Sequence, residues 1–488
     1  MLEDYFKKYR DNIVGIDQCF ETPYGTKKII YSDWTASGRL YLPIEQKLLN
    51  EIAPFVGNTH TETSVTGATM TKAYHEALSI IKKHVGASKE DIIISSNSGM
   101  TGVVNKFQRI LGLKIHEKHR KSVNIAKDER PVVFITHMEH HSNQTSWLET
   151  LADVKIIPYN DLGLVDIDGF AKQLQKYKQR KIKIAAVTSC SNVTGIMTPY
   201  YEIAGLIHEA GGLCFVDFAC SAPYIPINMH PADKKQKLDA IFFSPHKFLG
   251  GPGSTGVLVF NSKLYKNKIP DNPGGGTVDW TNPWGGHKYI DDIETREDGG
   301  TPAFLQTMKV ALCIKLKEEM SSEKMLQREE QMLEIIWKAF DKLENLHILA
   351  GHIRERLGVV SFYVDDLHYN LAVRLLNDRF GIQVRGGCSC AGTYGHFLLH
   401  VDKNRSRRIT KKISHGDLSE KPGWVRLSIN PVMTNEEIQY IADAITELCR
   451  NHQKWAEDYE YDVHTNEFNH KKNPDMESGR VQEWFAGI

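Results

Sequence analysis

Residues 184–217 read IAAVTSCSNVTGIMTPYYEIAGLIHEAGGLCFVD and carry the clearest signal of the chain's architecture. The two ends of this stretch, 184–189 and 213–217, are short apolar runs, whereas residues 199–210 have the spacing of an amphipathic helix. A continuous apolar run is typical of a strand that is buried on both faces of a parallel sheet. The stretch therefore predicts two strands joined by a helix, the repeating unit of an α/β fold.

The same alternation of apolar runs and helical stretches extends from about residue 70 to about residue 260. We expect a mostly parallel, mixed sheet between helices, with ligand sites at the carboxyl ends of its strands. The strands are predicted at 91–95, 131–136, 154–159, 184–189, 213–217, 240–244 and 256–260, and the helices at 73–86, 99–112, 142–151, 166–177 and 199–210.

Polar residues follow several of these predicted strands. Asp217 ends one strand, Ser244-Pro-His-Lys247 follows another, and HMEHHSN (137–143) and CSNVTG (190–195) follow two more. The segment SSNSG (95–99) leads into a predicted helix, whose free N–H groups and dipole favour an anion. The carboxyl edge of the sheet is therefore where we expect the site.

Lys247 lies in a turn directly after an apolar strand, between His246 and a glycine-rich segment. It is either a solvated surface charge or a partly desolvated amine that can form a Schiff base with an aldehyde. Asp217 is either a structural hydrogen-bond acceptor or the carboxylate that keeps a ring nitrogen protonated. A cofactor with an aldehyde, a phosphate and a pyridine nitrogen needs a lysine, a phosphate cradle and an acid, and the predicted strand ends offer all three.

Composition places the chain among soluble globular proteins. Of its 488 residues, 41% are hydrophobic and 25% charged, and 60 basic residues balance 60 acidic ones. A chain without net charge has no global field for nucleic acid or membrane phosphates. The N-terminus lacks a signal-peptide pattern, and no apolar stretch is long enough for a membrane helix. We expect a cytoplasmic protein without nucleic-acid or membrane partners.

The 8 cysteines are scattered along the chain, which is typical of free thiols in a reducing compartment. Cys388 and Cys390 form the one close pair. His396 and His400 follow that pair, but a zinc site would normally need a second close pair, so no metal is expected.

The length predicts more than one domain. We expect an N-terminal arm at 1–30 that belongs in part to a small domain, a large domain at 31–310, a small α+β domain at 311–455 and a polar tail at 456–488. A long helix is expected at 301–345 with a break near 320–322. Within the small domain, the basic stretch 401–416 is expected to form a loop that is solvated, docks an acidic partner or gates the site.

With these observations in place, the chain resembles the class V aminotransferase group of fold-type I pyridoxal-phosphate enzymes, and within it the cysteine desulfurase/selenocysteine lyase branch. The resemblance covers about residues 30–450. It rests on SDWTASG (32–38), GMTGVVN (99–105), MEHHSN (138–143), SNVTG (191–195), VDFACSAP (216–223), SPHKFLGGPGSTG (244–256), GGGT (274–277), GGTPAF (299–304), VRGGCSCAG (384–392) and VRLS (425–428).

The resemblance implies pyridoxal 5′-phosphate as the cofactor. Lys247 would hold it as a Schiff base and move protons, Asp217 would pair with the pyridine nitrogen, and His140 would stack on the ring, with His141 as the fallback. Asn192 would lie near the ring oxygen or the substrate carboxylate. Cys220 stands where the branch usually carries a glutamine that bonds the ring oxygen. The phosphate would be held by Gly99, Met100, Thr101, Ser244 and His246.

For the reaction, the resemblance implies that Arg426 binds the substrate carboxylate and that Cys390 takes the sulfur of L-cysteine as a persulfide while alanine leaves. Cys388 would be a resolving partner or an alternative nucleophile. Another class V reaction, such as amino transfer, epimerisation or a lyase reaction, remains open, and so does a phosphate- or cofactor-binding protein without turnover.

The resemblance also implies a homodimer with a shared active site. Thr277 would reach the cofactor phosphate of the partner subunit. An acceptor protein for the sulfur is a further possible partner.

Overall fold

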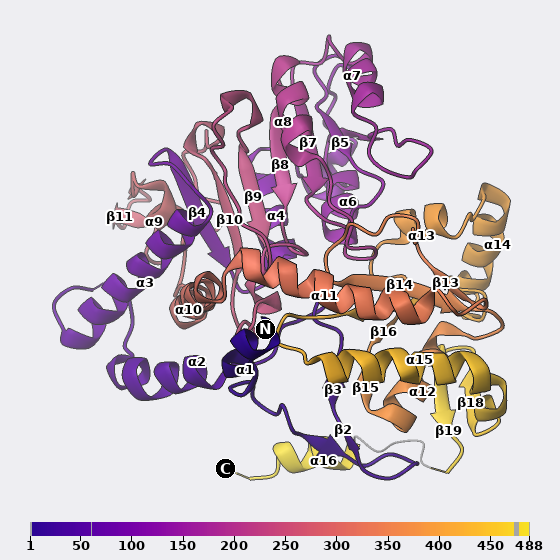
Figure 1. Cartoon of the computed structure of the whole chain (residues 1–488). Coiled ribbons are helices and arrows are strands. Elements are labelled where there is room, and N and C mark those ends of the chain that lie inside the picture. Colours follow the sequence, from indigo (N-terminus) through magenta and orange to yellow (C-terminus); the bar gives the residue numbers. More distant parts are fainter. Residues whose placement is uncertain (1, 60, 473–477, 488) are drawn as a thin grey trace. The chain divides into compact units, whose positions relative to one another are not determined.

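The computed structural model describes residues 2–59, 61–472 and 478–487 (Figure 1). The chain divides into two compact units. The larger unit comprises residues 37–191 and 197–323, and the smaller unit comprises residues 1–36, 192–196 and 324–488.

The larger unit is built on one seven-stranded sheet with the strand order β4-β10-β9-β8-β7-β5-β6. Strands β9, β8, β7, β5 and β6 are mutually parallel, and β10 runs antiparallel to both β9 and β4. All seven strands were predicted from the sequence, as was the mostly parallel sheet. Their bounds are β4 (Asp91–Ser96), β5 (Val132–Ile135), β6 (Asp153–Ile156), β7 (Lys183–Thr188), β8 (Leu213–Asp217), β9 (Ala240–Phe243) and β10 (Gly256–Asn261).

Helices cover both faces of this sheet. Phe107 of α4 packs against Phe215 of β8 and Phe260 of β10, with ring centroids 5.0 and 4.8 Å apart. Phe134 points to the opposite face, where it meets Phe170 of α7. The helices of this unit are α2 (Leu42–Lys47), α3 (Val65–His84), α4 (Gly99–Ile110), α5 (Glu117–Arg120), α6 (His141–Leu148), α7 (Ile167–Lys176), α8 (Tyr200–Glu209), α9 (Ile293–Glu297) and α10 (Phe304–Met320), and a hairpin joins β11 (Val278–Thr281) to β12 (His287–Tyr289).

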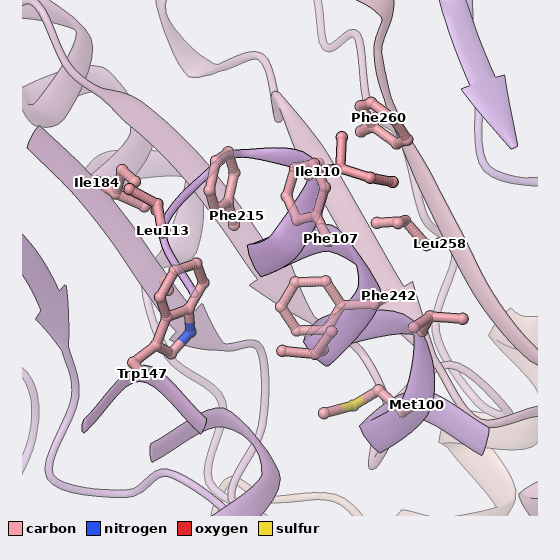
Figure 2. Packing of buried hydrophobic residues seen from close by; sticks show 14 of the residues in the cluster. Met100, Phe107, Ile110, Leu113, Trp147, Ile184, Phe215, Phe242, Leu258 and Phe260 are labelled. Carbon is pink, nitrogen blue, oxygen red and sulfur yellow. The ribbon is translucent and has the colours of Figure 1, made fainter. Parts of the chain in front are cut away.

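The core under α4 explains why that helix holds its position over the sheet. Figure 2 shows Phe107 among Phe215, Phe242 and Phe260, with Trp147 beside them. Phe107 is fully buried, so its whole ring is removed from water. Burial of this size is the main favourable term that fixes a helix on a sheet.

The Phe107→Ala variant is expected to lose about 3–5 kcal/mol of unfolding free energy, because it removes a buried ring and leaves a cavity. Leu49→Ala is the control, since the Leu49 side chain is 70% exposed, and should change stability by less than about 0.5 kcal/mol. Denaturant unfolding of both variants measures the difference. A Phe107→Ala loss as small as that of the control would contradict this packing.

The smaller unit contains a four-stranded antiparallel sheet with the order β13-β14-β17-β16. Segment 192–196 joins this unit, where Ser361 Oγ donates to Val193 O at 2.6 Å. The strands of the unit are β1 (Cys19–Phe20), β2 (Lys27–Lys28), β3 (Ile30–Tyr31), β13 (Leu346–Ile348), β14 (Val359–Val364), β15 (Ile382–Gln383), β16 (Arg385–Gly387), β17 (Trp424–Ser428), β18 (Tyr459–Asp462) and β19 (Glu467–His470). Its helices are α1 (Leu2–Arg10), α11 (Ser322–Phe340), α12 (Tyr369–Phe380), α13 (Gly392–Leu398), α14 (Lys403–Ser414), α15 (Asn435–Ala456) and α16 (Ser478–Trp484).

Two expectations about the connections can be compared with the structure. The break near residues 320–322 is confirmed, because Ser321 adopts a φ of 64° between α10 and α11. The loop expected at 401–416 is wrong, because most of this stretch forms α14. Asp402 caps that helix by accepting hydrogen bonds from the N–H groups of Asn404 and Arg405. The basic composition of the stretch had favoured a loop, although this cap residue lies within it.

Among the described residues, no helix combines the length and the apolarity that crossing a bilayer requires.

Candidate active site

The turn that carries Lys247 is tightly packed. It follows β9 directly, and Lys247 N donates to Ser244 O at 3.1 Å. Gly38 N donates to His246 O at 2.8 Å, and a Cβ on Gly38 would lie 1.9 Å from Phe248 O. A Cβ on Gly251 would lie 2.0 Å from Pro245 O. The glycines around Lys247 therefore let backbone pack closely against the turn and hold the lysine in place.

Four of the residues predicted to hold a phosphate lie together. Gly99 and Met100 begin α4, and Met100 N donates to Ser244 Oγ at 3.2 Å. The Thr101 hydroxyl lies 2.7 Å from Ser142 Oγ of α6. Ser98, which precedes the helix, makes no side-chain cap. The first turn of α4 thus combines backbone N–H groups with hydroxyls, which is the donor set that an anion needs.

Two glycines, Gly99 and Gly256, allow the backbone of β10 to pack closely against the start of α4. Gly99 has a φ of +62°, a conformation that other residues rarely adopt. A Cβ on Gly256 would lie 2.1 Å from the Gly99 carbonyl, so any larger residue at 256 would displace the start of α4. Gly256 is the first residue of β10, and its size therefore determines where the helix begins.

His246 lies in the Lys247 turn, with Nδ1 3.5 Å from Ser37 Oγ. Burial and, to a smaller extent, the neighbouring Lys247 charge together lower the pKa of His246 to about 4. The ring is therefore neutral at pH 7 and can donate one hydrogen bond.

Asp217 ends β8 as a buried carboxylate that is 2% exposed. Its Oδ1 accepts from Ala219 N at 2.7 Å. Burial raises the pKa of Asp217 to about 6, and the Ala219 N–H and the Lys247 charge oppose that rise. A cationic ring nitrogen would compensate the charge of this carboxylate much as a salt-bridge partner does.

His140 caps α6, and its Nδ1 accepts from Ser142 N at 3.1 Å. Since an accepting ring nitrogen carries no proton, the neutral ring carries its proton on Nε2. His141 is the first residue of α6, and burial lowers its pKa. The centroids of the two rings lie 6.3 Å apart. The hydrogen bond from Ser142 N holds the His140 ring, and His141 takes no part in that hydrogen bond.

Glu139 is a buried residue of this edge that the sequence analysis did not assign. Its carboxylate accepts from Thr136 N, from Thr188 N and from Asn143 Nδ2 at 3.1, 2.9 and 2.8 Å. It thereby links the loop that carries His140 to the end of β7. Burial, aided by the Asp217 charge and opposed by these hydrogen bonds, raises the pKa of Glu139 to about 7. The motif MEHHSN contained it, but only the contacts reveal that it is buried.

Cys220 and Thr277 are both buried in the larger unit. Cys220 is buried, and its Sγ donates to Ser191 O at 3.7 Å. Thr277 is fully buried, and its hydroxyl donates to Gly274 O within its own loop at 2.6 Å.

The smaller unit holds Arg426 on β17 as a buried cation. Arg426 Nη2 pairs with Asp33 Oδ1 at 2.8 Å, and Nη1 donates to Asn192 O at 3.2 Å. Asp33 also pairs with Arg385 through Oδ2 at 3.0 Å. Asp33 was not predicted as a site residue, although it lies in the motif SDWTASG, because nothing in the sequence places it beside residues 385 and 426.

Asn192 lies beside the cysteine loop of the same unit. Its Nδ2 donates to Ser389 O at 2.7 Å, whereas its buried Oδ1 has no hydrogen-bond partner among the described residues. Arg426 Nε is likewise buried without a partner among them. Buried polar groups are rarely left unpaired, so this donor and this acceptor are available to a ligand or to water.

The cysteine loop has an unusual backbone. Ser389 and Cys390 are consecutive residues with φ values of 48° and 55°, which costs energy for residues other than glycine. Ala391 N donates to Cys388 O at 2.9 Å across the turn. Cys388 is half-buried and Cys390 is exposed. Strain of this kind clusters at functional sites and presents the Cys390 thiol at the surface.

Among the described residues, no three His, Cys, Asp or Glu side chains gather as ligands for a metal ion.

The Glu139→Gln variant tests the buried carboxylate. The pKa of Glu139 rises from 4.5 to about 7 on folding, so the folded chain keeps a proton that the unfolded chain releases. The resulting stability is present below about pH 4.5 and is lost as the pH rises to 7, by about 3 kcal/mol at most. The variant cannot titrate, so its unfolding free energy should fall less over this range.

Denaturant unfolding at several pH values checks this difference. The control Glu344→Gln changes an exposed glutamate and should keep the wild-type slope. Equal slopes for the wild type and Glu139→Gln would show that Glu139 is not the titrating group.

A family model described as Aminotransferase class-V matches residues 30–441. The chain is 28% identical over 378 residues to a probable cysteine desulfurase of Staphylococcus epidermidis, covering 76% of this chain and 85% of that protein. It is 26% identical to a probable cysteine desulfurase of Halalkalibacterium halodurans, covering 74% and 84%. A cysteine desulfurase structure from Thermococcus onnurineus superposes with a TM-score of 0.72 at 22% identity, covering 91% and 98%.

The chain therefore belongs to the class V aminotransferase family of pyridoxal-phosphate-dependent enzymes. The α/β fold and the family that the sequence indicated are both confirmed.

Proposed function

We propose that the chain removes sulfur, or selenium, from a cysteine-like amino acid, with L-cysteine as the main substrate, and releases alanine. One observation carries the cofactor part of this proposal. Three groups lie at the carboxyl edge of one sheet: Lys247 follows β9, the buried Asp217 ends β8, and the phosphate donors at the start of α4 follow β4. Amine, acid and anion site are the three groups that pyridoxal 5′-phosphate requires.

The phosphate part of the edge fits the cofactor on a structural test. The lack of a side chain at Gly256 lets β10 pack directly against the Gly99 backbone at the start of α4, and the donors there are N–H and O–H groups. Met100 N, Thr101 Oγ1 and Ser244 Oγ would hold the phosphate oxygens, aided by the positive end of the α4 dipole. The neutral His246 ring would add one further donor.

The ring part of the edge fits as well. Asp217 Oδ1 is engaged by Ala219 N, and no hydrogen bond among the described residues engages Oδ2. Asp217 would keep the pyridine nitrogen protonated, Lys247 would hold the aldehyde, and His140 would lie on the ring face. Cys220 would lie near the ring oxygen, as would Asn192 if it does not bind the substrate. When bound, the cofactor supplies an electron sink for the substrate α-carbon.

Arg426 would bind the substrate carboxylate, and Asn192 would bind it through the second hydrogen of Nδ2, whose other hydrogen goes to Ser389 O. Arg426 Nε is a buried donor without a partner among the described residues, and its Nη2 is held by Asp33. A carboxylate paired with an arginine held in this way gains charge-assisted hydrogen bonds. The carboxylate thus orients the substrate while Lys247 moves the proton at its α-carbon.

Cys390 would take the sulfur. Its thiolate attacks the substrate sulfur, the new S–S bond forms, and the carbon–sulfur bond of the substrate breaks. The electron pair of the broken bond remains on the substrate carbon, which then gains a proton, so that alanine leaves and Cys390 carries the persulfide. The exposure of Cys390 and the backbone strain of its loop support this assignment.

The test measures alanine and sulfide released from L-cysteine in the presence of a reductant. We expect Cys390→Ala to lose about 100-fold or more in rate, since nucleophile removal abolishes the covalent step. The matched control Cys388→Ala should keep activity within about threefold. Equal rates for Cys390→Ala and the wild type would overturn the persulfide route.

Amino transfer is the second candidate function, and one residue favours it. Cys220 replaces the glutamine of the desulfurase branch, and a thiol is a weak donor toward a ring oxygen. A wild type that releases no alanine from L-cysteine, but converts an amino acid and a keto acid, would establish amino transfer instead.

The Arg426→Ala variant should raise KM for L-cysteine by about 30- to 1000-fold, since it removes one side of a buried charge pair. The matched control Arg385→Ala also removes a cation from Asp33 but is half-exposed, and should change KM less than about threefold. Steady-state kinetics of both variants measure the difference. An unchanged KM in Arg426→Ala would assign the carboxylate to another residue.

A shared active site in a homodimer, with Thr277 at the partner's cofactor phosphate, and a cytoplasmic location remain part of this proposal.

A further inference from the structure

Helix α14 carries two rows of basic side chains that differ in their partners. In the first row, Arg408 and Lys412 are four residues apart and both pair with Glu420, at 3.0 and 2.7 Å. Lys412 also reaches Asp417 at 3.6 Å. The positive charges of this row are therefore neutralised by carboxylates of the same chain.

The second row, hereafter the basic row, consists of Lys403, Arg407 and Lys411. These residues are also spaced by four, so they lie on one side of the helix, and all three are exposed. None of them makes an ion pair among the residues that the structure describes. Like charges spaced by four along a helix repel each other. The chain alone therefore leaves the basic row without charge compensation.

The buried side of α14 points away from the basic row. Ile409 is 5% exposed and is two residues from Arg407 and Lys411 in the sequence, which places it on the far side of the helix. Packing of Ile409 holds the helix on its unit, so the basic row faces solvent. The helix thus presents a charged surface that its own core does not use.

The same helix is tied to the cysteine loop. His396 Nδ1 lies 2.7 Å from Gly392 O, and its Nε2 lies 2.8 Å from Ser406 Oγ of α14. Because a carbonyl oxygen only accepts, Nδ1 donates, and Nε2 of the neutral ring accepts from the serine. Gly392 follows the exposed Cys390 by two residues, so α14 and the cysteine loop are joined through one histidine (Figure 1, orange).

We propose that the basic row is a docking surface for a partner protein that presents a row of carboxylates. Charge complementarity defines the partner, and the link through His396 attaches its docking site to the loop that carries Cys390. That the partner receives sulfur from Cys390 rests on the function proposed above. The docking itself requires only the basic row.

A discrete acidic face fits this surface better than a nucleic acid does. Asp402 lies at the start of α14, and Glu420 and Asp417 lie beside the first row. A continuous phosphate backbone that follows the helix would meet these carboxylates, whereas a short row of glutamates would not. The chain as a whole has no net charge to attract a polyanion.

The experiment uses a fluorescein-labelled helical peptide whose glutamates repeat every fourth residue, with binding read by fluorescence anisotropy at low salt. The triple variant Lys403→Gln/Arg407→Gln/Lys411→Gln should bind it about tenfold more weakly than the wild type, as expected for three exposed ion pairs. Added salt should weaken wild-type binding, because it screens such pairs.

The matched control is Lys172→Gln/Lys176→Gln/Lys178→Gln. It removes the same charge from three exposed lysines of the larger unit, two in α7 and one just after it, which make no ion pair among the described residues. This control should bind the peptide like the wild type. Equal losses in both variants, or no binding to the wild type, would overturn the proposal. The proposal would also be overturned if the binding of a single-stranded oligonucleotide of equal charge depended more strongly on the basic row than the binding of the peptide does.

Two measurements separate this proposal from the proposed reaction. Cys390→Ala should bind the peptide like the wild type, and the basic-row variant should release alanine from L-cysteine at the wild-type rate. A wild type without alanine release would overturn the reaction and leave the docking surface standing. A basic-row variant that keeps full peptide affinity would overturn the docking surface alone.

Discussion

The direction of hydrogen-bonded strands is the constraint on which the larger unit depends. Five neighbouring strands run parallel, so the residues that follow each of them emerge at the same edge of the sheet. The shared strand direction alone therefore brings residues that are far apart in the sequence, such as His140, Asp217 and Lys247, to the same edge. The packing of α4 on the sheet then adds a helix start to the same edge.

This edge also concentrates buried charge, which folding must stabilise. Asp217 and Glu139 are both buried, and burial raises the pKa of each carboxyl. The Asp217 charge adds to the rise for Glu139, while hydrogen bonds from backbone N–H groups oppose both rises. Asn192 belongs to a short segment, residues 192–196, that is part of the smaller unit, although the chain on both sides of this segment belongs to the larger unit. An isolated antiparallel β-bridge between Cys190 and Met197 joins the chain on the two sides of that segment.

The sequence could predict what depends on local pattern. The seven strands follow from apolar runs, and Lys247 stands out because a lysine after such a run is unusual. Asp33 and Glu139 could not be predicted as site residues, since Asp33 pairs with a residue 393 positions away and Glu139 accepts a hydrogen bond from one 49 positions away. The loop expected in place of helix α14 was wrong because the apolar side of this helix is narrow and the carboxylates that pair with it, Asp417 and Glu420, lie outside the basic stretch.

The central claim is that the strand-end edge of the larger unit places one lysine to hold an aldehyde cofactor. Borohydride reduction of the protein loaded with pyridoxal 5′-phosphate, followed by peptide mass spectrometry, locates the lysine directly, because reduction makes the link permanent. We expect the pyridoxyl group on the peptide that contains Lys247, and we expect Lys247→Ala to retain none. A label on another lysine in the wild type, or no label at all, would contradict the claim.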